Sequence, residues 1–172
     1  MRAGHPFRID TNPMSPASRA LLHFIALACV AAVGIALVSQ YVFGMQPCAW
    51  CVMQRLLYLL VALACWLGLA AGRARAERAR AAAALAALLS AGGAAAAWYQ
   101  YTVASQMFSC DQTFADRFMV QSGLDAGVPW LFGIYATCMD ARVTVLGVEY
   151  ALWSLALFCL LALAGLRAAL RG

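Results

Sequence analysis

Residues 47–70 read PCAWCVMQRLLYLLVALACWLGLA. Two cysteines, Cys48 and Cys51, and an arginine, Arg55, open this stretch, and an apolar run without charge follows directly. About 20 apolar residues in a helix are enough to span the roughly 30 Å hydrocarbon core of a bilayer. The stretch therefore predicts a transmembrane helix at about residues 52–71, with a cysteine pair and a charge at one of its ends.

The composition of the whole chain is that of an integral membrane protein. Of its 172 residues, 65% are hydrophobic and only 11% are charged, and its mean hydropathy is +0.79. A soluble domain of this length is less apolar. Four runs are long enough, or nearly so, to span a bilayer, at about residues 20–43, 52–71, 81–104 and 148–166. We therefore expect an all-α four-transmembrane-helix bundle, a single integral membrane domain over residues 1–172, with outer loops at about 44–51 and 105–147.

The arginines indicate how these helices are oriented. All twelve basic residues are arginines, and Lys and Arg accumulate in cytoplasmic loops. Nine of the twelve lie on one side of the predicted helices: Arg2, Arg8, Arg19, Arg73, Arg75, Arg78, Arg80, Arg167 and Arg171. We therefore expect both termini in the cytoplasm, and this distribution argues against a nucleic-acid partner.

The seven cysteines form two groups. Cys29, Cys65 and Cys159 lie inside the apolar runs, where a free cysteine packs as a small hydrophobic residue. Four more lie in or beside the predicted outer loops: Cys48, Cys51, Cys110 and Cys138. An even number of cysteines on the side where disulfides persist suggests two pairs.

The C-x-x-C of Cys48 and Cys51 is a weak signal by itself, since a redox pair, half of a zinc site and a structural staple all use it. Zinc would need histidines or a second close pair, and His5 and His23 lie in the N-terminal tail or within the first helix. A site made of all four loop cysteines is the remaining metal alternative. We expect no metal.

Arg55 favours the redox interpretation. It follows Cys51 by four residues, on the same helix face and about 6 Å along the axis. Cys51 also lies near a helix start, where backbone N–H groups favour an anion. Both effects favour the thiolate, which is the reactive form in disulfide exchange. The alternative is an interfacial arginine whose charge reaches the lipid headgroups.

The long second outer loop carries the other two cysteines, Cys110 and Cys138, with 27 residues between them. Turn signals fill its polar first half, whereas residues 128–135 are apolar and aromatic. We expect residues 128–135 to form a short interfacial helical segment. This segment would keep Cys138 near the bilayer and near Cys48, and leave Cys110 on a more mobile arm. The alternative for the pair is a structural staple of the loop.

These features together resemble the DsbB family, the bacterial inner-membrane disulfide bond formation protein B. The resemblance covers roughly residues 20–166. Its most specific pieces are the P-C-A-W-C at residues 47–51 with Gln54 and Arg55, then Cys110 followed by Asp111. Cys138 before the last helix belongs to the same pattern, and L-G-V-E at residues 146–149 is a weaker match.

The resemblance implies a quinone-dependent thiol:disulfide oxidoreductase of the bacterial inner membrane, with its active cysteines in the periplasm. It implies that Cys110 and Cys138 oxidise a periplasmic DsbA-like partner, with Cys110 forming the mixed disulfide. Cys48 and Cys51 would reoxidise that pair. Cys51 would lie next to a ubiquinone or menaquinone, and Arg55 matches the family's quinone-site arginine.

Two other functions are compatible with parts of the pattern. A relative of vitamin K epoxide reductase would also be a four-helix membrane protein with a C-x-x-C, but its redox pair would lie on the last helix. A non-catalytic four-helix membrane scaffold would use its cysteines for structural disulfides. In such a scaffold Arg55 would be replaceable without consequence.

Overall fold

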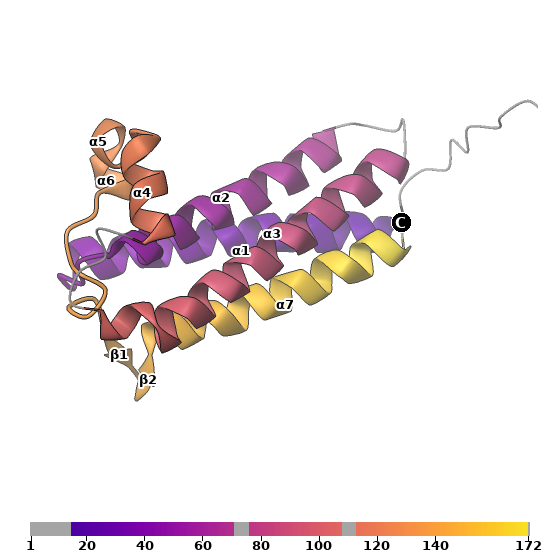
Figure 1. Ribbon diagram of the computed structural model, residues 1–172. Coiled ribbons are helices and arrows are strands. Elements are labelled where there is room, and N and C mark those ends of the chain that lie inside the picture. Colours follow the sequence, from indigo (N-terminus) through magenta and orange to yellow (C-terminus); the bar gives the residue numbers. More distant parts are fainter. Residues whose placement is uncertain (1–14, 71–75, 108–112, 172) are drawn as a thin grey trace, which may run out of the picture.

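Four long helices pack side by side in an elongated bundle (Figure 1). The computed structural model describes residues 15–70, 76–107 and 113–171. The long helices are α1 Pro16–Tyr41, α2 Ala49–Ala70, α3 Ala76–Thr102 and α7 Tyr150–Arg171. Each is long and apolar enough to cross a membrane, so the predicted fold class, an all-α four-helix membrane protein, is confirmed.

The helix ends follow from local capping. α1 begins at Pro16, before the predicted start, because the Ser15 hydroxyl accepts a hydrogen bond from the backbone N–H of Ser18 at 3.2 Å, and a proline fits the first turn of a helix. α2 begins at Ala49, so that Cys51 lies in its first turn rather than in the preceding loop. α7 begins at Tyr150, because a short hairpin occupies the residues before it.

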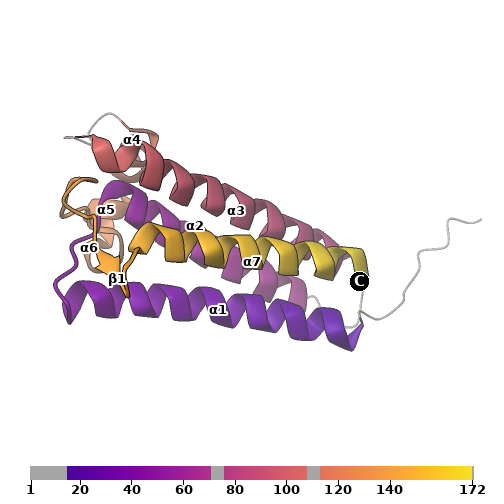
Figure 2. The same ribbon diagram turned by 90° about the horizontal axis from the view of Figure 1, so that it is seen from below.

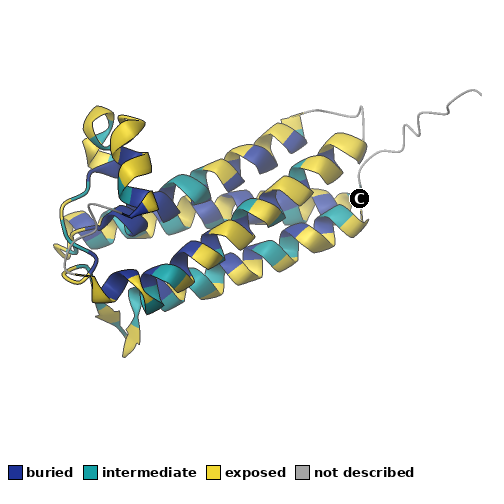
Figure 3. Ribbon diagram, in the orientation of Figure 1, coloured by how far each residue is buried: buried dark blue, intermediate teal, exposed yellow. Residues whose placement is uncertain are grey.

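The helices form a closed ring in which α2 contacts α1 and α3, and α7 contacts α3 and α1. α2 is the most enclosed of the four helices. In α2, 56% of the residues of its apolar 18-residue stretch are buried, against 28–33% in the corresponding stretches of the other three helices. Exposed residues lie along their outward faces (Figure 3). Many of the exposed residues are large and apolar, such as Leu27, Leu88 and Leu163. Such a surface is unsuited to water and suited to lipid.

Phe158 of α7 shows how closely this helix packs on both α2 and α3. The ring of Phe158 in α7 stacks on Tyr58 of α2 with 4.0 Å between the ring centroids. A Cβ added to Gly93 of α3 would lie 2.3 Å from the Phe158 ring, whereas one added to Gly92 would meet nothing within 4 Å. Gly93 therefore lets α3 and α7 pack within the chain.

Short elements cover one end of the bundle, which we call the loop end (Figure 2). α1 begins and α7 ends at the opposite end. The short elements are the 3-10 turn η1 Ala104–Gln106, α4 Phe114–Gln121, α5 Leu124–Gly127, α6 Pro129–Phe132, β1 Thr144–Val145 and β2 Val148–Glu149. α4 and α6 pack on α2. The loop end therefore encloses the start of α2, where the C-x-x-C lies.

The hairpin of β1 and β2 is not predicted by the sequence. Its two turn residues, Leu146 and Gly147, have φ values of 54° and 79°, which is the pattern of a type I′ turn. A leucine is unusual in this conformation, so the turn has no sequence signature at its first position. Trp153 of α7 donates its indole N–H to the Val145 carbonyl at 3.1 Å and holds the hairpin against the bundle.

Candidate functional site

The C-x-x-C pair lies where the chain enters α2. Cys48 is fully buried immediately before the helix, and Cys51 is partly exposed in the first turn. Both are free cysteines, and their sulfurs lie 2.8 Å apart. A disulfide needs about 2.0 Å, so the pair can close with a movement of less than about 1 Å. The geometry suits a pair that alternates between dithiol and disulfide.

The two cysteines are not equivalent. The hydrogen bond between Cys48 and Cys51, together with the burial of the Cys48 sulfur, raises the pKa of Cys48 well above its usual range. When one of the two thiols ionises, Cys48 is therefore the one that keeps its proton, and it can then donate a hydrogen bond to the thiolate of Cys51. Cys51 is the sulfur that accepts hydrogen bonds, and acceptance favours the thiolate.

Arg55 lies one helical turn beyond Cys51, with only 5% of its surface exposed. Its Nη1 donates to Gln40 Oε1 at 2.7 Å and to the Leu131 carbonyl at 2.9 Å. An arginine that extended to the lipid headgroups would be exposed, so the burial of Arg55 contradicts that alternative. No carboxylate in residues 15–70, 76–107 and 113–171 forms an ion pair with Arg55. A buried charge without a carboxylate partner favours an anion nearby, and Cys51, which interacts electrostatically with Arg55, can become one.

Two more glutamines, Gln54 and Gln100, are linked by hydrogen bonds to the cysteine pair. Gln100 of α3 directs its Nε2 at Cys51 Sγ, 3.2 Å away, and at Cys48 Sγ, 3.7 Å away. Its Oε1 accepts a hydrogen bond of 2.6 Å from Gln54 Nε2. Sequence reasoning did not find Gln40 or Gln100 as site residues. A glutamine inside an apolar membrane span is a sequence signal for a functional position, although it does not identify the group that the glutamine contacts.

A cavity of about 430 Å³ lies against this cluster. Cys51, Gln54, Arg55 and Gln100 form its polar wall. The rest of its lining is mostly apolar and comes largely from α1, α7, the hairpin and the neighbouring loops, including Ile35, Val145, Leu146, Trp153 and Leu157. A cavity of this size and lining suits an apolar, ring-shaped ligand with few polar atoms.

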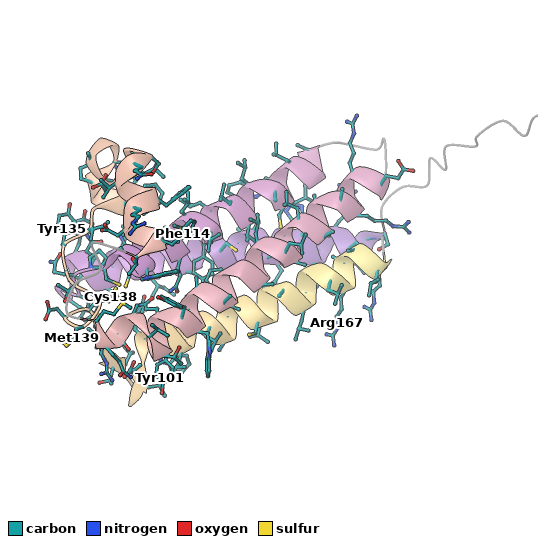
Figure 4. All side chains as sticks on the ribbon, in the orientation of Figure 1. Tyr101, Phe114, Tyr135, Cys138, Met139 and Arg167 are labelled. Carbon is teal, nitrogen blue, oxygen red and sulfur yellow. The ribbon has the colours of Figure 1, made fainter. Side chains whose placement is uncertain are left out.

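Cys138 comes to the same place from the second loop. It is disulfide-bonded and 1% exposed, and it packs in one buried cluster with Cys48, Met119 and Phe132. It also lines a small second cavity together with Gln100. Figure 4 places Cys138 at the loop end and Arg167 at the opposite end of the bundle. Cys110, predicted to act with Cys138, lies outside the described residues.

The segment predicted to lie at the interface, residues 128–135, contains α6 and is fixed over the site. The Tyr41 hydroxyl donates to the Trp130 carbonyl at 2.8 Å, and Arg55 donates to the Leu131 carbonyl. The N–H groups of Tyr135 and Ala136 donate to the Pro47 carbonyl at 3.0 and 3.2 Å. These bonds join the second loop to the residue that precedes Cys48.

Four apolar helices, a cysteine pair next to a buried arginine and a disulfide-bonded cysteine packed beside it define a multi-pass membrane protein built for thiol chemistry. Over residues 18–168 the chain matches the family model of the disulfide bond formation protein DsbB. The chain belongs to the DsbB family. It is accordingly a membrane oxidoreductase that acts in disulfide bond formation, as the resemblance implies.

Individual relatives agree with the family model. The chain is 35% identical over 175 residues to "Disulfide bond formation protein B" of Verminephrobacter eiseniae, covering 95% of this chain and 90% of that protein. It is 33% identical over 156 residues to the protein of the same name from a Polaromonas species, covering 86% and 88%. It is 32% identical over 147 residues to "Disulfide bond formation protein B 1" of Pseudomonas aeruginosa, covering 84% and 88%.

Proposed function

We propose that this protein reoxidises a periplasmic DsbA-like dithiol protein and passes the electrons to a membrane quinone through two cysteine pairs. The observation that carries the proposal is the position of Cys51 and Arg55 in the wall of the largely apolar cavity. The protein would lie in the bacterial inner membrane as a single domain. Its loop end would face the periplasm, and both termini the cytoplasm, because the arginines gather beyond the other end.

The first part of the proposed relay is disulfide exchange. A thiolate of the partner attacks Cys110, a bond forms between these two sulfurs, and the bond from Cys110 to Cys138 breaks with its electron pair on Cys138. The partner's second thiolate then attacks the partner sulfur of this mixed disulfide, so that the partner's own disulfide forms and the bond to Cys110 breaks with its electron pair on Cys110. The reduced pair next opens a Cys48–Cys51 disulfide in the same manner. The presence of Cys138 and Cys48 in one buried cluster supports this transfer, which moves two electrons and two protons in total.

The residues of the cavity fit a quinone. Arg55 can donate hydrogen bonds to a ring oxygen, and Cys51 lines the same cavity. Ile35, Trp153 and Leu157 offer apolar surface for the ring and the start of its isoprenoid tail. A bound quinone supplies a two-electron acceptor. Such an acceptor is needed because a DsbA-like protein is a strong oxidant, near about −120 mV, which ordinary thiol exchange cannot recharge.

The proposal is tested with purified protein in detergent. Reduced DsbA-type dithiol protein is supplied with a ubiquinone or a menaquinone analogue, and quinone absorbance is followed. We expect the quinone to be consumed and each serine variant of Cys48, Cys51, Cys110 and Cys138 to stop its consumption. The matched control is Cys159→Ser, which changes an exposed cysteine of α7 away from the site.

Folded protein that consumes neither quinone would refute the proposal and favour the structural scaffold. Full turnover in any of the four variants would refute the two-pair relay. The faster of the two quinones would identify the preferred acceptor.

A further inference from the structure

We propose that Gln100 acts on the sulfur of Cys51 as a fixed hydrogen-bond donor that stabilises its thiolate, and that Gln54 positions Gln100 for this task. The inference rests on the proposed function only in taking Cys51 as the sulfur that leaves when the C-x-x-C disulfide opens. It adds a residue of α3 to a site otherwise built around the start of α2.

The hydrogen bonds form a chain with one direction. Gln54 Nε2 donates to Gln100 Oε1 at 2.6 Å, and Gln100 Nε2 donates to Cys51 Sγ at 3.2 Å. A side-chain amide carries its oxygen and its NH₂ group on opposite sides of one carbon. Because Gln54 occupies the oxygen of Gln100, the NH₂ group faces the sulfurs. Cys51 therefore meets a donor from α3, not an acceptor.

A donor in this position distinguishes the two states of Cys51. A thiolate can only accept hydrogen bonds, and it accepts them more strongly than a neutral thiol does. Gln54 and Gln100 are 5% and 8% exposed, so water competes little for these bonds. Both side chains are neutral, and they leave the charge of Arg55 to act on the thiolate. Gln100, Cys48 and Arg55 thus all favour the thiolate form of Cys51.

The amide matters most at one chemical step. An incoming thiolate attacks Cys48, a new S–S bond forms to Cys48, and the Cys48–Cys51 bond breaks. The electron pair of the broken bond stays on Cys51 as a thiolate. A donor already in place stabilises this charge as it develops, and a more stable leaving thiolate leaves faster.

The test measures Cys51 without quinone or partner. In a Cys48→Ser background, the rate at which iodoacetamide alkylates Cys51 at pH 7 is followed by mass spectrometry of its peptide. Hydrogen bonds to charged groups are strong enough that we expect Gln100→Leu to slow alkylation by at least about tenfold. The control Gln106→Leu makes the same change at an exposed glutamine of η1 and should leave the rate unchanged.

Gln54→Glu tests the positioning role with a side chain of nearly the same shape. A carboxylate can only accept, so it would draw the NH₂ group of Gln100 toward itself and turn Oε1 toward the sulfur. We expect alkylation to slow about as much as in Gln100→Leu, by about tenfold. This variant also serves if Gln100→Leu does not fold. An unchanged rate in the folded Gln54→Glu protein would overturn the positioning role.

Alkylation and quinone turnover separate the inference from the proposed function. Unchanged alkylation in folded Gln100→Leu protein overturns the inference, whatever the turnover is. Slower alkylation in a series whose parent protein consumes quinone supports both. Slower alkylation in a series whose parent consumes no quinone supports the amide donor and refutes the oxidase.

Discussion

Replacing Arg55 by methionine removes the buried charge of the site and keeps an unbranched, flexible side chain in its place. Arg55 lies about 6 Å along the helix from Cys51. Two unit charges at this separation interact by about 3 kcal/mol at an effective dielectric constant of about 20. This energy corresponds to about a hundredfold change in the thiolate population of Cys51. We expect quinone turnover at limiting quinone to fall by at least about tenfold, since part of the effect is screened.

The same variant should fold. Losing Arg55 leaves Gln40 Oε1 without its donor, which costs about 1–3 kcal/mol. Removing a buried charge offsets much of that cost, so the free energy of unfolding should change by less than about 2 kcal/mol. Turnover, Cys51 alkylation and thermal unfolding in detergent are measured together, with Arg167→Met as the control at the opposite end of the bundle. Parental turnover and parental alkylation in Arg55→Met would refute the electrostatic argument.

Three further predictions concern packing, backbone and relay. Gly93→Ala should lower the free energy of unfolding by about 1–3 kcal/mol because its Cβ meets the Phe158 ring, whereas Gly92→Ala should raise it by about 0.5–1 kcal/mol; equal melting temperatures would contradict this packing. Leu146→Gly should stabilise the hairpin by about 1 kcal/mol, since glycine adopts positive φ freely, and a lower melting temperature would count against it. Cys110→Ser should abolish oxidation of the dithiol partner, and full activity would exclude the relay.

The long helices were predictable because an apolar run of membrane length has few alternatives. The burial of Arg55 was harder to predict from the sequence, because the side chain of an arginine near a helix end can turn either to the lipid headgroups or inward. Its direction depends on Gln40 and the Leu131 carbonyl, which come from α1 and α6. Contacts between helices leave no periodic trace in one sequence.

The approach of Cys138 to Cys48 followed from the apolar character of residues 128–135, which draws the second loop to the bundle. The hairpin did not follow, because Leu146 occupies a turn position that normally carries Asn, Asp or Gly. The role of Gln100 also escaped prediction. A single glutamine in an alanine-rich helix has no spacing that relates it to a cysteine 49 residues away.

The Pro47 carbonyl, which accepts the N–H groups of both Tyr135 and Ala136, couples the two loops mechanically. A force that draws the second loop outward, such as the grip of a docked protein, would act on the residue next to Cys48. Conversely, closing or opening the C-x-x-C would change the tension on these two amides. Hydrogen–deuterium exchange at Tyr135 and Ala136 should therefore differ between the oxidised and reduced protein, so these two amides could report the redox state of a pair to which they do not belong.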